Sequence, residues 1–555
     1  MSWIFVNTGQ CGNQVGHEII DGLWEHTTDS DECNLYFQEL SNGKLIARSV
    51  NLDTEEKVVN ACFDRTRGAA WGYDRKSIAH EYGGAGNNWA MGHSCTDAFL
   101  HKSLNCVRRQ AEACDTPANL LISHSVGGGT GSGLGTKLTE SLYDEFNDLT
   151  KVNFAITPYH FGEVIVQHYN TILCLSKISS CSDAILLFEN ETAHHICKSM
   201  KSISTPTLYD INQAIAANII PALLSKVCMD DLHDHSPPPP AAKGGARQSQ
   251  KTPSKPTLYN ANHHIRSGQT ADNRQGSALR SSNRGVANSS WSFSRSQSFA
   301  NDITELCSHP DYKYVNIYNA PQSSSSSVAF TYDSWIAILN SVGRTQLQLQ
   351  HLKPIAKGIT GSNTGGAVSY SYSTPEKGGI SSSPAVGTPP AGAGEPSSKP
   401  PRSLKSILVF RGLDPQTAEH DIANQYHTRN GSFHHHQRQK GPDQSASPGT
   451  MKELNRDIIS KILAQYCEYS PLFNGSGAPS IYGSHHMANR YQRSACLITN
   501  NTACVPILNR SLVKSLELYQ ARAYLHHYFD YGLEISDFTE ALQSISQTVQ
   551  NYSAL

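Results

Sequence analysis

The sequence predicts an α/β protein built on a doubly wound parallel sheet, and three observations lead to this prediction. Strand-like and helix-like segments alternate through the first 230 residues, which is typical of parallel strands joined by crossover helices. Residues 127–135 read GGGTGSGLG, with six glycines in nine positions, directly after the apolar segment NLLISHSV at 119–126. Apolar residues then recur at helical spacing, namely Leu134, Leu138, Leu142, Phe146 and Leu149. The glycines are therefore expected on a strand-to-helix turn.

Other elements are predicted along the chain. SWIFVNTG at residues 2–9 is expected to be the first strand, and VNFAITPY at 152–159 a strand that follows the glycine-rich turn and its helix. A longer helix is predicted at about 210–230, because apolar residues line one of its faces, namely Ile211, Ile215, Ile219, Leu223 and Val227. An ordinary core helix would show the same pattern, so the pattern predicts a helix and no function.

Length, charge and cysteine content limit the class of protein. A chain of 555 residues exceeds what one core usually supports, so roughly two to four domains are expected. The 45 Lys and Arg residues nearly balance the 47 Asp and Glu residues, so the net charge of −2 favours neither nucleic acid nor an anionic membrane as a partner. The 14 cysteines form no CxxC pair, which favours reduced thiols. With no signal-like or membrane-spanning run, the chain is expected in the cytoplasm.

Three segments have the composition of disordered insertions. Residues 236–298, 355–402 and 429–449 are rich in Pro, Ser, Gly and other polar residues and contain few large aliphatic side chains. Such segments cannot bury enough apolar surface to offset the entropy lost on ordering. We therefore predict that they interrupt the folded chain.

The glycine-rich turn predicts a phosphate site. At the start of a helix, free N–H groups and the positive end of the helix dipole attract anions, and missing Cβ atoms let phosphate oxygens reach the amides. The expected contacts are Gly127, Gly128, Gly129, Thr130 and Gly131. A closely packed turn without a ligand would also use glycines.

Two common phosphate loops do not fit this turn. A Walker loop needs Gly-Lys followed by Ser or Thr, whereas Lys137 follows Thr136 and precedes Leu138. The Rossmann pattern GxGxxG also fails. If the pattern starts at Gly129, its third glycine is required at position 134, which is Leu134. The stretch GGGTGSGLG instead closely resembles the signature loop of the tubulins and their bacterial homologues.

Other segments resemble the same family in the family's order. GQCGNQVG at 9–16, LDTEEKVV at 52–59 and AGNNWAMGH at 85–93 resemble the first, second and third nucleotide loops of tubulins. YQRSACLITNNTACV and ARAYLHHYFDYGLEISDFTEAL resemble a strand of the intermediate domain and the C-terminal surface helices. The resemblance implies a tubulin-like fold with a GTP-binding domain at 1–235, which includes a central helix, a mixed-sheet intermediate domain at 299–504 and C-terminal helices at 505–555.

The resemblance also implies the roles of single residues. Phosphate and base contacts are implied for Gln10, Cys11 and Gln14, and γ-phosphate contacts for Gly86 and Asn87. Asp53 and Glu55 are implied to lie near the magnesium ion and the terminal phosphate. Glu163 is implied to bind the ribose, and Asn190 and Asn212 the guanine. Leu208 stands where the family usually stacks an aromatic ring on the guanine, so either Leu208 packs there or Tyr209 compensates.

The chemistry of these side chains suits the implied roles. An Asn amide offers a donor and an acceptor to guanine, and a carboxylate accepts from ribose hydroxyls. Two acids one residue apart suit Mg²⁺ held through water, because that ion gives up few of its waters. Each residue alone could equally be a solvated or turn-forming residue, and Cys11 a small buried apolar side chain. The prediction therefore depends on their order and spacing.

Two alignments give different candidates for the residue that would support GTP hydrolysis. In tubulins a carboxylate of the next subunit polarises the attacking water, so one active site is shared between two chains. NDITELCSHP at 301–310 resembles the helix that carries this acid. Alignment forward from Asp302 places Glu305 there, whereas counting back from Pro310 places Asn301 or Asp302 there. Acids at a helix start also favour the helix dipole without any chemistry.

Two functional interpretations follow. The chain ends QTVQNYSAL, without the run of Glu in the tails of α- and β-tubulin, which favours a specialised tubulin. The first interpretation, which the resemblance implies, is a structural subunit of the microtubules of centrioles, basal bodies and cilia, with GTP or GDP and Mg²⁺ as cofactors and other tubulins (α/β, or ε) as partners. The second is a stand-alone nucleotide-dependent enzyme, which should carry its own base near the phosphate loops. No base is evident there beyond the two magnesium acids, which favours the first.

Overall fold

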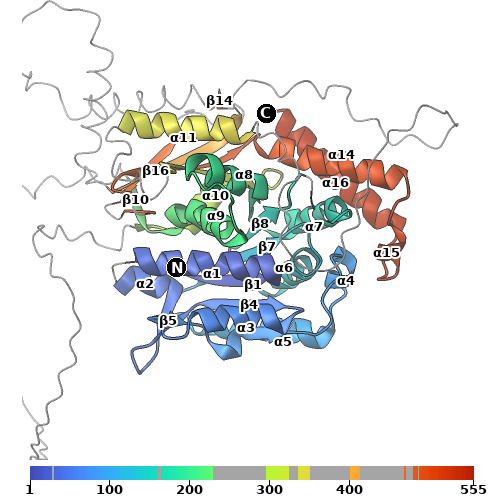
Figure 1. The fold of residues 1–555 in the computed structure, drawn as a ribbon, viewed down its shortest axis with the longest axis horizontal. Helices are drawn as coiled ribbons and strands as arrows, with labels where there is room; N and C mark the ends of the chain where they lie inside the picture. The colour runs from blue at the N-terminus through green and yellow to red at the C-terminus, as the bar shows by residue number, and fades with distance from the viewer. Residues whose placement is uncertain are drawn as a thin grey trace, which may run out of the picture. The chain divides into compact units, whose positions relative to one another are not determined.

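A computed structural model describes residues 1–27, 30–160, 162, 164–228, 296–323, 335–350, 401–412, 468–469, 479–484, 487–489 and 491–555. The chain divides into a compact unit of Met1–Leu232 and Ser296–Leu555 and a second unit, His233–Arg295, which lies outside the described residues. All features below belong to the first unit (Figure 1).

Six parallel strands confirm the predicted doubly wound fold. They are β1 (Ser2–Thr8), β4 (Ser49–Asp53), β6 (Ile78–His80), β7 (Ala118–Ser125), β8 (Lys151–Thr157) and β9 (Ala184–Glu189). Their order is β9-β8-β7-β1-β4-β6, and each neighbouring pair is parallel. The chain builds the sheet first toward β6 and then toward β9, so the direction reverses between β1 and β7. Ligands of such sheets bind at the carboxyl ends of the strands beside this reversal.

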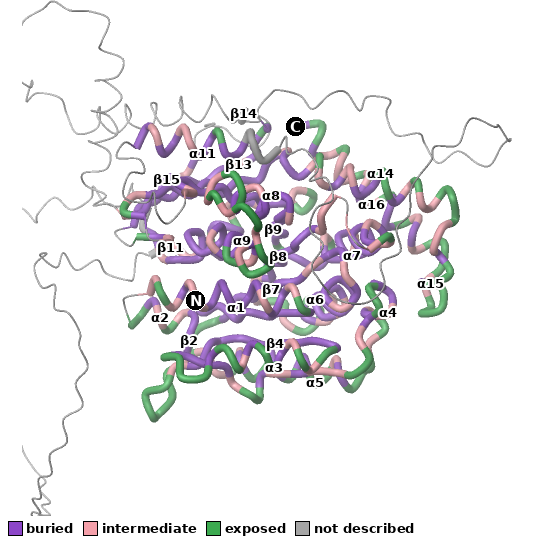
Figure 2. The backbone as a smooth tube through the Cα atoms, in the orientation of Figure 1, coloured by how far each residue is buried: buried purple, intermediate pink, exposed green. Residues whose placement is uncertain are grey.

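Both faces of the parallel strands are covered by helices. Trp3 and Phe5 of β1 belong to the core under α1 and α9, whereas Ile4 and Val6 belong to the core under α5 and α6. These helices and α7 are α1 (Gly9–His26), α5 (Asp97–Glu112), α6 (Gly135–Glu145), α7 (Gln167–Cys181) and α9 (Leu208–Leu223). Figure 2 shows the strands between these helices as buried. Burial on both faces explains why the strands read as nearly continuous apolar runs.

The sheet continues into a mixed part, most of whose strands lie within the predicted intermediate domain at 299–504. β12 (Tyr314–Ala320) pairs in parallel with β9, and β16 (Ser494–Asn501) pairs antiparallel with β12. The remaining strands are β13 (Arg402–Arg411), β15 (Ser480–Ser484), β10 (Lys226–Cys228), β11 (Ser296–Gln297) and β14 (Glu468–Tyr469). In the described part of the chain, these strands and the parallel ones form one 13-stranded sheet.

The C-terminal helices pack on α7, as Figure 1 shows. They are α14 (Cys504–Gln520), α15 (His526–Phe529) and α16 (Ile535–Ser553), and their start lies one residue from the predicted position. Leu508 of α14 and Phe538 of α16 share a core with Ile172 of α7. This packing brings α15 next to α4.

Shorter elements complete the described fold. The helices are α2 (Ser30–Tyr36), α3 (Glu56–Arg65), η1 (Arg75–Ser77), α4 (Trp89–His93), η2 (Thr130–Leu134), α8 (Asn190–His195), η3 (Ile196–Met200), α10 (Phe299–Leu306) and α11 (Trp335–Gln350). A small sheet contains β2 (Phe37–Glu39), β3 (Leu45–Ala47) and β5 (Trp71–Gly72). No helix among the described residues is long and apolar enough to cross a membrane.

Two helices end earlier than the apolar pattern predicts. α9 ends at Leu223, and Val227 lies in β10, where it pairs with β15. α6 ends at Glu145, so Phe146 caps it and Leu149 packs beyond it. In both places the apolar residues beyond the helix end are explained by tertiary contacts and not by the helix.

Two predicted insertion boundaries also move. Ser296 and Gln297 form β11, Ser298 caps α10, and Arg402 begins β13. The ordered chain therefore includes the last residues of two of the predicted insertions. Residues 236–295, 355–400 and 429–449 lie outside the described residues, and their disorder stays a prediction.

Candidate nucleotide site

The first predicted nucleotide loop lies against the glycine-rich turn at the carboxyl end of β1. Thr8 ends β1, and Gly9 begins α1 with a φ of +74°. A Cβ on Gly9 would lie only 2.8 Å from the backbone N of Gly131, so glycine is required for this close approach. Asn13 Nδ2 donates to the carbonyls of Gly9 and Leu52, both at 2.9 Å. The first loop is thus fixed between the glycine-rich turn and β4.

The glycine-rich turn lies between β7 and α6, as predicted, but some of its glycines serve packing. A Cβ on Gly129 would lie 2.5 Å from the carbonyl oxygen of Ala85, and one on Gly133 would lie 2.2 Å from a backbone oxygen of α4. A Cβ on Gly128 would meet no atom within 4 Å. Close packing therefore explains why glycine is needed at Gly129 and Gly133, whereas Gly128 leaves space for a phosphate oxygen.

The second predicted loop joins the same turn. The hydroxyls of Thr54 and Thr130 lie 2.6 Å apart. Asp53 is 2% exposed, and its Oδ1 accepts from the backbone N of Glu55 at 3.3 Å. Its Oδ2 is buried and has no hydrogen-bond partner among the described residues. Burial raises the pKa of Asp53 to about 7.

These two acids fit a magnesium ion. A buried carboxylate oxygen without a partner is costly, and a cation beside it would remove that cost. The side chain of Glu55 is exposed next to Asp53, and both residues offer the oxygen ligands that Mg²⁺ prefers.

The third predicted loop is held in a left-handed conformation beside the glycine-rich turn. Gly86 and Asn87 both have a φ of +52° and are exposed. Asn88 caps α4, because its Oδ1 accepts from the backbone N of Ala90 at 2.8 Å. The loops and the turn therefore converge at one edge of the sheet, as the sequence predicts.

The predicted guanine contacts come from α1, α8 and α9. Asn212 Nδ2 donates to Gln14 Oε1 at 3.3 Å, so these two predicted residues lie together. Asn190 is half-buried and begins α8 directly after β9. Gln10 is exposed in the first turn of α1. Cys11 beside it packs against the main core, and burial raises its pKa to about 12, so the thiol stays protonated.

Leu208 and Tyr209 have different surroundings. Leu208 is 64% exposed at the start of α9. The Tyr209 hydroxyl accepts from Gln213 Nε2 at 2.7 Å, and the guanidinium of Arg65 lies 5.6 Å from the centre of its ring. Tyr209 is 51% exposed as well, so which of the two residues faces the base stays a prediction. Glu163, the predicted ribose contact, lies outside the described residues.

The two candidate catalytic acids differ in accessibility. Asp302 is 0% exposed and forms an ion pair with Lys226, so it cannot reach the nucleotide of another subunit. Burial raises the pKa of Asp302 to about 6 even with this partner. Glu305 is half-buried on α10, where it accepts from Ser480 and lies 3.1 Å from Lys405 Nζ. Burial therefore argues against Asp302 in the predicted role, and the role of Glu305 stays a prediction.

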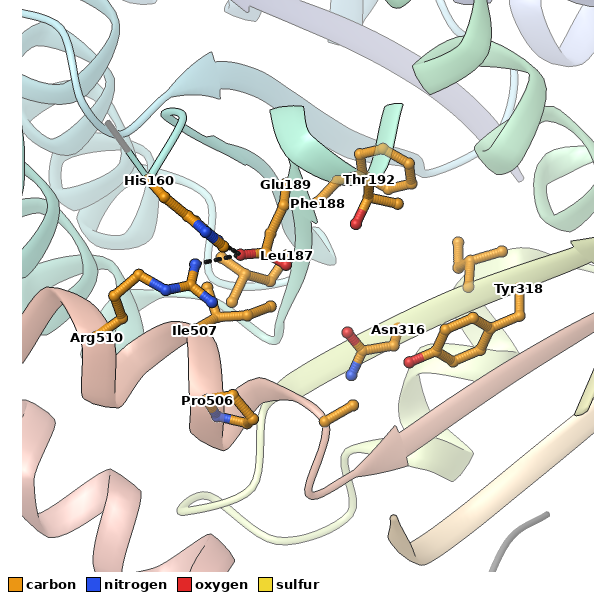
Figure 3. A pocket seen from close by; sticks show the side chains of 12 residues that line it. His160, Leu187, Phe188, Glu189, Thr192, Asn316, Tyr318, Pro506, Ile507 and Arg510 are labelled. Atoms are coloured by element: carbon orange, nitrogen blue, oxygen red, sulfur yellow. Dashed lines mark hydrogen bonds and ion pairs between the residues drawn. The ribbon is translucent and has the colours of Figure 1, made fainter. Parts of the chain in front are cut away.

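A pocket beside β9 contains none of the predicted nucleotide contacts (Figure 3). Glu189 Oε1 lies 2.7 Å from Arg510 Nη1 and 3.4 Å from His160 Nε2. Burial would raise the pKa of Glu189, but the hydrogen bond with His160 and the charge of Arg510 lower it. The negative charge of Glu189 is thus balanced by the positive charge of Arg510 within the pocket.

Comparisons with known proteins agree with the fold and the loops. Residues 2–198 match the family described as "Tubulin/FtsZ family, GTPase domain". The chain is 26% identical to the tubulin delta chain of Homo sapiens and 25% identical to that of Mus musculus, and each alignment covers 100% of both chains. It is 35% identical to the tubulin beta-1 chain of Hypocrea rufa over 231 residues, which are 39% of this chain and 51% of that one.

The doubly wound sheet, the converging loops and this family match identify residues 2–198 as a GTPase domain of the tubulin/FtsZ type. The family domain implies binding of GTP or GDP. Within the family, FGEVIVQHYN, SDAILLFENE, DINQAIA and SILVFRG resemble delta-tubulin, with ε-tubulin as the alternative. The full-length matches to tubulin delta chains confirm the first of these, and the chain is delta-tubulin-like.

Proposed function

We propose that this chain is a structural GTP-binding subunit that acts in building the triplet microtubules of centrioles and basal bodies, and hence in the formation of cilia. The observation that carries this proposal is the meeting of the three loops and the glycine-rich turn in a chain similar to tubulin delta chains over its full length. Its partners would be α/β-tubulin, ε-tubulin and centriolar microtubules.

Each loop would take a separate part of the nucleotide. The glycine-rich turn would bind phosphates at Gly128, and Gly86 and Asn87 of the third loop would contact the γ-phosphate. Gln14, Asn190 and Asn212 would bind the guanine, and Glu163 the ribose. The exposed Gly86 and Asn87 and the open space at Gly128 support these roles.

Asp53 and Glu55 would hold Mg²⁺ through water. The ion would neutralise charge on the terminal phosphates. The buried Oδ2 of Asp53, which lacks a partner among the described residues, supports this assignment.

Nucleotide retention tests the phosphate assignment. Purified protein should retain GTP or GDP, and Gly128→Val should lower retention at least about tenfold, because the new side chain occupies the space left for phosphate. Gly128→Ala should have a smaller effect. Gly129→Val cannot serve here, since its side chain would collide with Ala85.

Thermal unfolding of Gly128→Val, compared with nucleotide-free wild-type protein, controls for a folding defect. A folded Gly128→Val protein that retains as much nucleotide as wild type would contradict the phosphate assignment.

The cellular role is tested by the position of a tagged copy in ciliated cells. We expect the tag at centrioles and basal bodies. A uniform distribution through the cytoplasm would contradict the centriolar role and leave nucleotide binding unaffected.

A further inference from the structure

A buried amide joins the third loop, the glycine-rich turn and the C-terminal helices. Asn170 of α7 is fully buried, and its Nδ2 donates to the carbonyls of Asn87 at 2.8 Å and Gly127 at 3.0 Å. Its Oδ1 accepts from the backbone N of Trp89 at 2.9 Å and from the Tyr528 hydroxyl at 2.7 Å. Every hydrogen-bonding position of this amide is therefore used.

Tyr528 reaches this amide from α15, near the end of the chain. Its buried ring packs edge-on against Tyr169 and Phe538, with ring centres 5.8 and 5.3 Å away. These contacts fix the ring and so set the position of its hydroxyl. Beside it, Asn88 Nδ2 donates to the carbonyl of His527 at 2.7 Å. The C-terminal segment thus holds the third loop directly through Asn88 and indirectly through Asn170.

The third loop needs such support, because its backbone is unusual. Gly83, Gly84, Gly86 and Asn87 all have positive φ, and Asn87 does so with a side chain. A conformation of this kind persists where surrounding contacts impose it. The bond from Asn170 to the Asn87 carbonyl is one of these contacts, and Tyr528 in turn orients Asn170.

We propose that Asn170 and Tyr528 are positioning residues for the γ-phosphate contacts of the third loop, and that through them the terminal phosphate of GTP is coupled to α15. The proposal rests on the proposed assignment of Gly86 and Asn87 to the γ-phosphate. Tyr528 does not touch the nucleotide and acts through the amide of Asn170. Because such coupling is reciprocal, a partner that shifts α15 would change the preference for GTP over GDP.

The test is Tyr528→Phe, which keeps the ring and removes only the hydroxyl. Titration calorimetry should show about 3- to 10-fold weaker binding of a non-hydrolysable GTP analogue, as expected for one lost hydrogen bond. GDP binding should weaken less than binding of the GTP analogue, because GDP lacks the phosphate that contacts the third loop.

Tyr552→Phe is the matched control. Tyr552 is also fully buried in a C-terminal helix, and its hydroxyl donates to Asn500 Oδ1 and accepts from the backbone N of Tyr314, both at 2.9 Å. These partners lie outside the loops, so this variant should lose stability without changing the ratio of GTP to GDP affinity.

The outcomes separate this inference from the proposed function. Failure of wild-type protein to bind either nucleotide would overturn the proposed function. If wild-type protein binds both and Tyr528→Phe keeps the wild-type affinity ratio, or weakens both equally, the coupling is overturned while nucleotide binding stands.

Hydrogen exchange gives a second measurement of the coupling. Amides of α15 in wild-type protein should exchange more slowly with the GTP analogue than with GDP, and Tyr528→Phe should remove the difference. Equal exchange of α15 in both nucleotide states of the wild type would also overturn the coupling.

Discussion

His17 gives the protein a pH-dependent contribution to stability. It is buried in α1, where its Nδ1 lies 2.9 Å from the Tyr73 hydroxyl and its ring packs beside Trp71. Burial lowers the pKa of His17 to about 4, and the charge of Arg65 adds to this. Between pH 6.5 and pH 4 the unfolded chain therefore binds a proton that the folded protein excludes. This contribution is complete above pH 6.5 and is lost as the pH falls to 4.

We expect His17→Phe to weaken the pH dependence of the free energy of unfolding in this window. Wild-type protein should lose up to about 3 kcal/mol from this residue between pH 6.5 and pH 4. The variant should lose less over the same range in urea unfolding. Tyr73→Phe removes the same hydrogen bond but keeps the imidazole, so it should retain the wild-type slope. An identical slope in His17→Phe and wild type would contradict the assignment.

Replacing Leu208 by an aromatic residue should increase nucleotide affinity. Since Leu208 is 64% exposed where the base is expected, Leu208→Tyr should add a ring that stacks on guanine and tighten GTP and GDP binding by about 1 kcal/mol. Fluorescence titration with both nucleotides would measure the change. Tyr209→Phe, which removes only the hydroxyl held by Gln213, should leave affinity unchanged. No gain in the first variant, or a loss in the second, would indicate a different position of the base.

For single residues, the sequence shows which chemical groups are present but not which of them are buried. Spacing within NDITELCSHP could not separate Asp302 from Glu305, because the burial of Asp302 depends on Lys226, which lies 76 residues away. The glycine count predicted the turn but not that Gly129 and Gly133 face another backbone segment. Asn170 was missed, although a polar Asn followed by the apolar run of a buried helix was a visible signal.

Among the elements, α9 shows why helix ends are hard to predict. Its apolar spacing continues to Val227, but the helix stops at Leu223. The fully buried guanidinium of Arg411 donates to the carbonyls of Pro221, Leu224 and Ser225 at 2.9, 2.6 and 3.2 Å. This cap comes from β13, 187 residues beyond Leu224, so local sequence contains no sign of it.

Arg411→Lys should therefore destabilise the protein by about 2–4 kcal/mol, because an ammonium cannot reproduce the three-way fork and the remaining carbonyls stay buried. The free energy of unfolding in urea measures this cost. Arg67→Lys is the control, since Arg67 is exposed and its pair with Asp64 lies on the surface. Equal stability of Arg411→Lys and wild type would show that the cap is unimportant.

For the whole molecule, strand order explains why the sequence could predict that the loops lie together. Loops after β1, β4 and β7 must meet once these strands are neighbours in a parallel sheet, so alternating elements and loop motifs were sufficient. The path from the glycine-rich turn to Tyr528 could not be predicted in this way. Its last hydrogen bond joins Asn170 to Tyr528, which are 358 positions apart, and only the packing of α14 and α16 on α7 creates it.

Assembly should control hydrolysis if Glu305 of one subunit completes the site of another. Glu305 lies half-buried on α10 and is not part of the phosphate loops, so a monomer would hold only half of an active site. Dilute protein should then bind GTP but turn it over very slowly, and the rate per molecule should rise with protein concentration or on addition of α/β-tubulin.

Glu305→Gln should abolish that rise, lowering the assembled rate by about 100-fold, as expected for loss of the group that polarises the attacking water. GTP affinity should be unchanged, because the variant alters no residue of the loops. Glu517→Gln, an exposed acid on α14 paired with Lys514, should leave the rise intact. Phosphate release over a range of protein concentrations would measure all three proteins. Rapid hydrolysis that is independent of concentration and unaffected by Glu305→Gln would contradict the shared site and favour a stand-alone enzyme, since a structural subunit needs only slow turnover coupled to assembly.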